Sequence, residues 1–177
     1  MKSKQLLLVL IIFLCYLFIA EAADPRLQEL IGRRYTGLKD FPVLDDFRNI
    51  GNILVEKENI FSSDRETFHR LFVFRKENTG LLILMRYVPD NTGTVIHVAD
   101  LIEVEGMDQE KYLGYGGSCR LNRKVDDRII ALFKIESNKK KIFRKIYKAW
   151  RIDTAAGKMN EIPVKGIDFI NSDYEAD

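Results

Sequence analysis

Hydrophobic and polar residues alternate along the middle of the chain in the manner of a β-sheet. Between residues 68 and 104, three apolar runs are separated by the turn signals "KENTG" and "PDNTG", which lie about one strand length apart. This spacing predicts an antiparallel meander. Residues 81–88, "LLILMRYV", are apolar at both sets of alternate positions, which is typical of a central strand covered on both faces. The strand that begins at Val95 has the same character.

The C-terminal third of the chain carries further strand patterns. In "RIIALFKIES" apolar side chains alternate from Ile129 onward, so a strand is expected there. Residues 141–153, "KIFRKIYKAWRID", fit a helix or a strand, because their apolar positions also fall on one side of a helix. β-branched and aromatic residues crowd this segment and a turn-like "TAAGK" follows it, which favours the strand. The remaining "VKGIDFIN" is expected to add a short edge strand.

The segment before the meander is less regular. Residues 24–32, "DPRLQELIG", predict a short helix that starts at Pro25 and ends at Gly32. A strand is expected over residues 53–61. Together these patterns predict a β-rich α+β fold in a single domain over residues 23–177. We expect an antiparallel meander sheet or a partly closed barrel, with a short N-terminal helix.

The first residues of the chain have the pattern of a secretory signal peptide. Lys2 and Lys4 precede an apolar run from Leu6 to Ala20, and small residues follow at cleavage spacing. The run is shorter than the roughly 20 apolar residues that a membrane-spanning helix needs, and no second such run follows it. We therefore expect residues 1–22 to be removed by cleavage near Ala22, which leaves no transmembrane segment.

The net charge and the cysteine content indicate the cellular compartment in which the protein is expected. The net charge of +2 is small, so nucleic acid is not an expected partner. Cys15 lies within the signal peptide, which leaves Cys119 as the only cysteine of the mature chain and excludes an internal disulfide. The chain also lacks an Asn-x-Ser/Thr glycosylation site. These features favour an exported bacterial protein that is periplasmic or secreted.

Cys119 is the first candidate for chemistry, because it follows a run of glycines and precedes several basic residues. A nucleophilic thiol needs access and a nearby base or positive charge. The chain contains only two histidines, His69 and His97, that could act as the base. His97 and Asp100 point to opposite faces of an unbroken strand, so a relay from these residues to Cys119 requires a β-bulge. Catalysis by Cys119 and His97 is therefore the minority hypothesis.

The favoured interpretation of this stretch is architectural. We expect Gly114, Gly116 and Gly117 to permit positive φ in a connection between strands. Cys119 is then expected to pack as a small apolar residue near the start of the next strand.

A basic segment provides a second candidate site. Residues 138–151, "NKKKIFRKIYKAWR", interleave lysine and arginine with aromatic residues. Such a surface suits phosphates, acidic polysaccharide or anionic lipid headgroups. The predicted binding residues are Lys141, Arg144, Lys145, Lys148, Trp150 and Arg151. The alternative is that the lysines keep a strand edge soluble and the aromatic residues belong to the core.

Acidic pairs in the chain lack the spacing of a calcium loop, so no metal and no cofactor are predicted. The sequence predicts a non-enzymatic binding or interaction domain. Its expected partner is an unknown protein or an anionic component of the cell envelope. Two alternatives stay open: a thiol-dependent enzyme or redox protein that uses Cys119, and a carrier whose sheet curls around a small apolar ligand.

Overall fold

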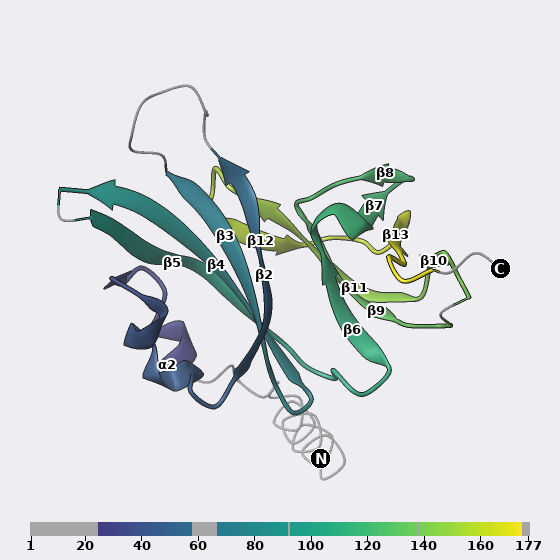
Figure 1. Cartoon of the computed structure of the whole chain (residues 1–177), viewed down its shortest axis with the longest axis horizontal. Coiled ribbons are helices and arrows are strands. Elements are labelled where there is room, and N and C mark those ends of the chain that lie inside the picture. The colour runs from purple at the N-terminus through teal and green to yellow at the C-terminus, as the bar shows by residue number, and fades with distance from the viewer. Residues whose placement is uncertain (1–24, 58–66, 92, 138, 175–177) are drawn as a thin grey trace, which may run out of the picture.

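The structure is a computed structural model that describes residues 25–57, 67–91, 93–137 and 139–174. The predicted signal peptide, residues 1–22, lies outside the described residues. The described chain forms three antiparallel sheets and one short α-helix (Figure 1). Within it, no helix has the length and apolar character that crossing a membrane requires.

The large sheet confirms the predicted meander. Its strands lie in the order β1-β5-β4-β3-β2, so β2 to β5 are neighbours in space as they are in sequence. Two-residue turns join β3 to β4 and β4 to β5, at the positions of the two turn signals. The strands are β1 (Arg34–Tyr35), β2 (Arg48–Lys57), β3 (Phe68–Lys76), β4 (Thr79–Asp90) and β5 (Gly93–Val104).

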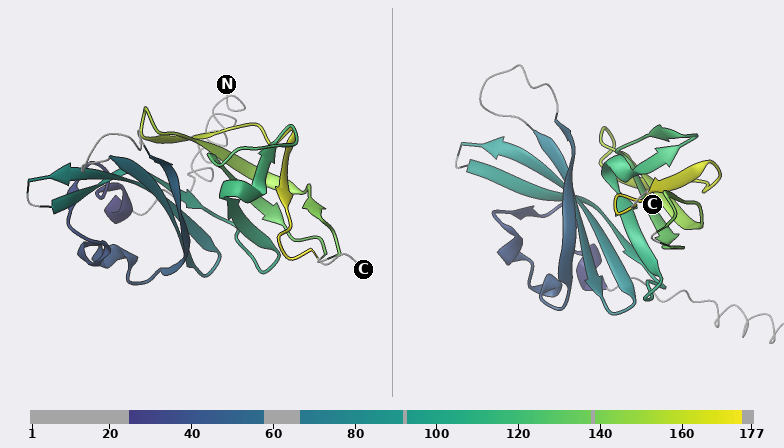
Figure 2. Two further views of the ribbon diagram at one scale, coloured as in Figure 1. Left: turned by 45° about the horizontal axis from the view of Figure 1, so that its top comes forward. Right: turned by 45° about the vertical axis from the view of Figure 1, so that its right-hand side comes forward.

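The centre of the large sheet is covered on both faces, as the apolar pattern of residues 81–88 predicts. In β4 the five side chains from Leu81 to Met85 are fully buried. One face packs against the N-terminal segment and the other against a second sheet (Figure 2). The N-terminal segment contains α2 (Pro25–Gln28), η1 (Leu38–Asp40) and η2 (Pro42–Leu44). The expected helix begins at Pro25 as predicted, but it is a single turn that ends at Gln28 and not at Gly32.

The middle sheet has the strand order β12-β11-β9-β6. Its strands are β6 (Lys111–Tyr115), β9 (Ile129–Lys134), β11 (Ile146–Asp153) and β12 (Lys158–Glu161). The ambiguous segment 141–153 therefore forms strands, and "TAAGK" forms the β11–β12 turn. One face of this sheet meets the large sheet through Ile130, Leu132 and Trp150, which pack with Leu82 and Leu84 of β4.

The small sheet covers the other face of the middle sheet. It has the order β10-β13-β7-β8, and a 3₁₀ turn, η3 (Gly116–Ser118), leads into it. Its strands are β7 (Cys119–Leu121), β8 (Lys124–Val125), β10 (Ile142–Phe143) and β13 (Ile167–Ile170). The last predicted strand is present, but its expected edge position is wrong. β10 pairs with the outer side of β13 and makes it internal.

Two further expectations need correction. The described strands form three open sheets and no closed barrel, because the chain passes from one sheet to the next instead of pairing β2 with a later strand. The strand expected over residues 53–61 begins earlier, at Arg48, and residues 58–61 lie outside the described part of the chain.

Candidate functional site

Cys119 lies in the sealed space between the middle and small sheets. Its exposed fraction is 0 %, and it packs with Ile129, Ala131, Ala149 and Ile167. Burial raises the pKa of the Cys119 thiol to about 12. The thiol therefore lacks both the access and the ionisation that a nucleophile requires at neutral pH.

The glycines before Cys119 have two different roles. Gly116 adopts a φ of +68°, as the sequence predicts for a connection, whereas Gly117 in the same turn does not have a positive φ, so the expectation for Gly117 is wrong. Gly114 instead lies within β6, where an added Cβ would be 2.1 Å from the Phe169 ring. It pairs with Ala131, which pairs with Ala149, so small residues form a row across the middle sheet. This row makes room for the small sheet.

The structure tests whether His97 and Asp100 can act together. A bulge at Ala99 is present, because Leu84 pairs with Asp100 while the next residue of β4 pairs with Val98. The Asp100 carboxylate, however, accepts hydrogen bonds from the Met159 backbone N–H at 2.7 Å and from Lys158 at 3.1 Å. These bonds connect β5 to β12, and Cys119 lies beyond the middle sheet. Asp100 thus joins two sheets.

The basic segment does not form one continuous surface. Trp150 is only 4 % exposed and belongs to the core between the large and middle sheets, so its ring is not accessible to a ligand. Arg151, on the opposite face of β11, forms an ion pair with Asp126 at 2.9 Å. Alternation along a strand separates these two neighbours.

The other predicted basic residues are exposed in two places. Lys145 lies over the ring of Tyr147, 5.6 Å from its centroid, and Lys148 lies further along β11. Lys141 and Arg144 line a hollow beside the small sheet. The six residues therefore divide among the core, an ion pair and two surface regions.

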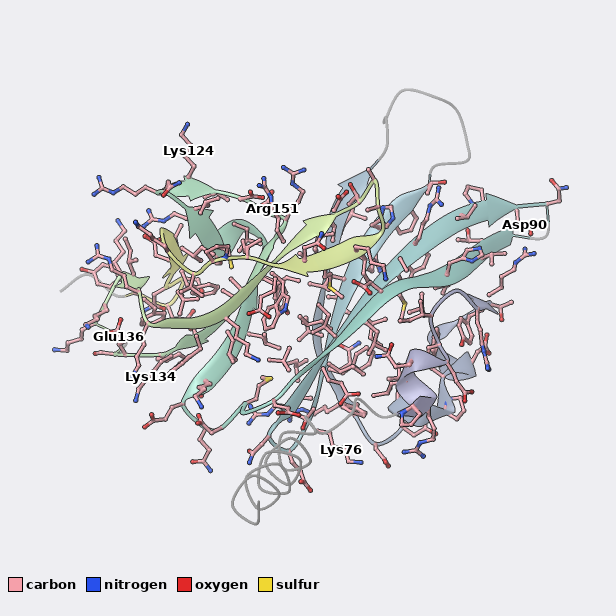
Figure 3. The ribbon with its side chains drawn as sticks, turned by 180° about the vertical axis from the view of Figure 1, so that it is seen from behind. Lys76, Asp90, Lys124, Lys134, Glu136 and Arg151 are labelled. Carbon is pink, nitrogen blue, oxygen red and sulfur yellow. The ribbon has the colours of Figure 1, made fainter. Side chains whose placement is uncertain are left out.

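A cleft in the large sheet brings together side chains that are distant in the sequence. It has a volume of about 510 Å³ and lies between β3–β5 and the β11–β12 turn, which crosses over this sheet (Figure 3). We call it the cleft. The described residues that line it are Ile31, Gly32, His69, Arg86, Val88, His97, Val98, Ala99, Thr154, Ala155, Ala156 and Gly157.

Three basic side chains form a row along one wall of the cleft. His97 pairs with Arg86, and Arg86 pairs with His69, so the three lie directly opposite one another on β5, β4 and β3. Paired residues project from the same face, on strands about 4.8 Å apart. The row continues to Arg34 on β1, which forms an ion pair with Asp90 at 2.6 Å.

The electrostatics of the cleft favour an anion. None of the described residues that line it is acidic. Arg86 is exposed, and no carboxylate among the described residues forms an ion pair with it. Its guanidinium can donate two parallel hydrogen bonds to one carboxylate or phosphate group. The fixed positive charge between the two imidazoles also disfavours a shared metal ion, and the described residues contain no metal-ligating cluster.

The sequence analysis missed this cleft, although its signal was present. Counting residues back from each two-residue turn places His69, Arg86 and His97 opposite one another. The turn signals predict where the strands end, and the two-residue length of each turn in the structure fixes their register. The far wall, from Thr154 to Gly157, follows only from the packing of the middle sheet on the large one.

Comparisons with known proteins identify no relative of this chain. No family model, curated protein or solved structure matches the chain.

Proposed function

We propose that this chain is an exported, non-enzymatic binding domain that holds a small anionic ligand in the cleft. The observation that carries the proposal is the row of His69, Arg86 and His97 on a wall of the cleft without acidic neighbours in its lining. Both histidines of the chain belong to this row. Export is inferred from the signal-like pattern of residues 1–22.

The lining favours a monoanionic carboxylate with a short apolar chain. Arg86 supplies one permanent charge and a planar fork that matches a carboxylate. Val88 and Ala99 provide apolar surface nearby, and the turn from Thr154 to Gly157 is built of small residues. A volume of about 510 Å³ lies in the range of small-molecule sites.

Burial favours binding over catalysis. His69 is only 2 % exposed, so its imidazole contributes to the wall and has little access to a substrate. The thiol of Cys119 is sealed in a different layer. The apolar interior between the sheets is filled by side chains, which argues against a large enclosed carrier cavity.

Calorimetric titration of residues 23–177 with butyrate tests the proposal. Arg86→Gln removes the charged fork and is expected to weaken butyrate binding about tenfold or more. Lys124→Gln is the matched control, because it removes one exposed charge from β8, outside the cleft. Equal affinity of the wild type and Arg86→Gln for butyrate, or no binding by the wild type, would overturn the proposal.

A further inference from the structure

A second hollow, on the small sheet, has a different charge arrangement from the cleft. It has a volume of about 520 Å³ and is lined by Asn122, Arg123, Arg144, Gly166, Ile167 and Asp168. We call it the groove. We propose that the groove binds a phosphate group between the guanidinium groups of Arg123 and Arg144. This site is independent of the cleft, which lies on another sheet.

The conformation of Arg123 is the first argument. Asn122 and Arg123 form the two-residue turn between β7 and β8, with φ values of +50° and +69°. Positive φ at both positions is the geometry of a type I′ turn, whose preferred sequence is Asn-Gly. An arginine therefore occupies a position where glycine is less strained. Strain of this kind at the wall of a hollow points to a functional side chain.

The turn is held firmly in this position. The backbone N–H of Asn122 donates a hydrogen bond to the carbonyl of Gly166 at 2.8 Å. Gly166 has a φ of +83°, and a Cβ added there would lie 2.5 Å from the side-chain oxygen of Asn122. The turn and the segment before β13 thus fix each other, and the start of the Arg123 side chain is preorganised.

The neighbouring carboxylates already have partners. Asp168 lines the groove but accepts two hydrogen bonds from Arg120, at 2.6 Å from Nε and 2.8 Å from a terminal nitrogen. Glu136 accepts hydrogen bonds from Lys140 at 2.8 Å and from the backbone N–H of Arg144 at 3.3 Å.

Arg123 therefore keeps its charge for a ligand, and Arg144 adds a second guanidinium whose charge, after the hydrogen bond from Lys140, also helps to lower the pKa of Glu136 in the adjoining hollow. Neither Arg123 nor Arg144 forms an ion pair within the described part of the chain. Arg144 also lines the adjoining hollow, which contains Lys140 and Lys141 together with Glu136, so a net positive charge continues past the groove. Two of the basic residues predicted from the sequence thus lie beside this site.

The number of permanent charges favours phosphate over a carboxylate. Each guanidinium can donate two parallel hydrogen bonds to a pair of oxygens. A carboxylate has two oxygens and one charge, which one arginine satisfies. A phosphate group has enough oxygens and charge to bind both arginines at once. Free phosphate and the headgroup of an anionic phospholipid share this chemistry.

The decisive variant is Arg123→Gly, followed by titration of residues 23–177 with inorganic phosphate. Glycine relieves the strain of the turn, so the melting temperature is expected to rise by about 2–4 °C. Loss of one guanidinium is expected to weaken phosphate binding about tenfold or more. A gain in stability with a loss of binding separates a functional arginine from a structural one.

Two further variants complete the test. Arg144→Gln is expected to weaken phosphate binding to a similar extent, whereas Lys124→Gln, next to the turn, is expected to leave it unchanged. Unchanged phosphate affinity in Arg123→Gly, or no phosphate binding by the wild type, would overturn the proposal. Butyrate binding in the cleft is measured separately, so either proposal can fail alone.

Vesicles distinguish the two sources of phosphate. Co-sedimentation with phosphatidylglycerol vesicles that is lost in Arg123→Gly, and absent with phosphatidylcholine, supports the site with a lipid headgroup as its ligand. Binding of inorganic phosphate without sedimentation supports the site with free phosphate as its ligand. Sedimentation that persists in both Arg123→Gly and Arg144→Gln would contradict a role for the groove at a membrane.

Discussion

The cleft and the groove concentrate positive charge by different means. The cleft uses regular strand positions, because a straight row across β3, β4 and β5 carries two histidines and Arg86. The groove uses a strained turn and a residue in the connection between β10 and β11. In the cleft, the register of the large sheet places basic side chains side by side without backbone strain. In the groove, the strands are short, and an unfavourable backbone conformation orients the side chain of Arg123.

The two regions also differ in the strands on which they lie. The cleft lies on a sheet whose central strand is buried on both faces, while the groove lies on short strands at the outer layer. Figure 3 places Lys124 of β8 and Asp90 of β4 at opposite ends of the molecule. The middle sheet contributes to both regions, because its β11–β12 turn lines the cleft and its other face packs against the small sheet.

The largest expected effect comes from Trp150→Ala, which removes a buried ring from the middle sheet. We expect a loss of about 3–5 kcal/mol in the free energy of unfolding, measured by urea denaturation. Tyr147→Ala is the matched control, because Tyr147 is an aromatic residue of β11 that is 38 % exposed. A similar loss in both variants would contradict the assignment of Trp150 to the shared core.

Gly114→Ala is expected to disturb the groove and spare the cleft. The new methyl group would lie 2.1 Å from the ring of Phe169, which cannot retreat easily because it stacks on Phe133 at 4.1 Å. We expect a cost of about 1–3 kcal/mol and weaker phosphate binding, with unchanged butyrate binding.

The control for this variant is Gly117→Ala, where the nearest atom to the new Cβ is 3.7 Å away. It should leave denaturation and both titrations close to those of the wild type. Loss of butyrate binding in Gly114→Ala would show that the two regions are coupled.

The ionisation of the Cys119 thiol reports how firmly the small sheet covers the middle sheet. The folded thiol has a pKa of about 12, above its ordinary value of 9.0, so the unfolded chain ionises first as the pH rises. Its contribution to stability is complete below pH 9 and is lost between pH 9 and about 12.

Urea denaturation at several alkaline pH values checks this expectation. Relative to Cys119→Ala, the wild type should lose up to about 1.4 kcal/mol per pH unit above pH 9. Parallel pH dependence in the two proteins would show that solvent reaches the thiol, and that the small sheet is loosely attached.

The smallest expected effect is at the rim of the cleft. Gly157→Ala places a side chain at a φ of +64° and 3.4 Å from the Cβ of Ala99. We expect a cost of about 1 kcal/mol from the backbone strain and weaker butyrate binding, with phosphate binding unchanged. Gly37→Ala is the control, because its φ is not positive and no atom lies within 4 Å of the new Cβ.

The fold was predictable where a local pattern decides it. The two turn signals and the apolar run of residues 81–88 predicted the meander and its buried centre. Residues 141–153 were ambiguous because the side chains that pack in a strand here also fit one side of a helix. The edge position expected for β13 was wrong because pairing with β10 joins segments that are far apart in the sequence.

The candidate sites were less predictable, because the sequence does not show which side chains are accessible. Cys119 has glycine and basic neighbours in the sequence that suit a reactive thiol, yet it faces a sealed layer of the structure. The basic segment around Trp150 is continuous in the sequence, but alternation along β11 divides its side chains between two faces. Local chemistry is visible in a sequence, whereas accessibility depends on what packs above each residue.

The sequence by itself determined the β-rich class, the meander and the burial of β4. Each follows from periodicity and turn length, which act over a few residues. Only the tertiary structure decided that the chain forms three open sheets, that Cys119 is enclosed, and that the β11–β12 turn closes a cleft over the row of His69, Arg86 and His97. The physical reason is that packing between sheets depends on side chains from distant segments, such as the row from Gly114 to Ala149 that admits Phe169.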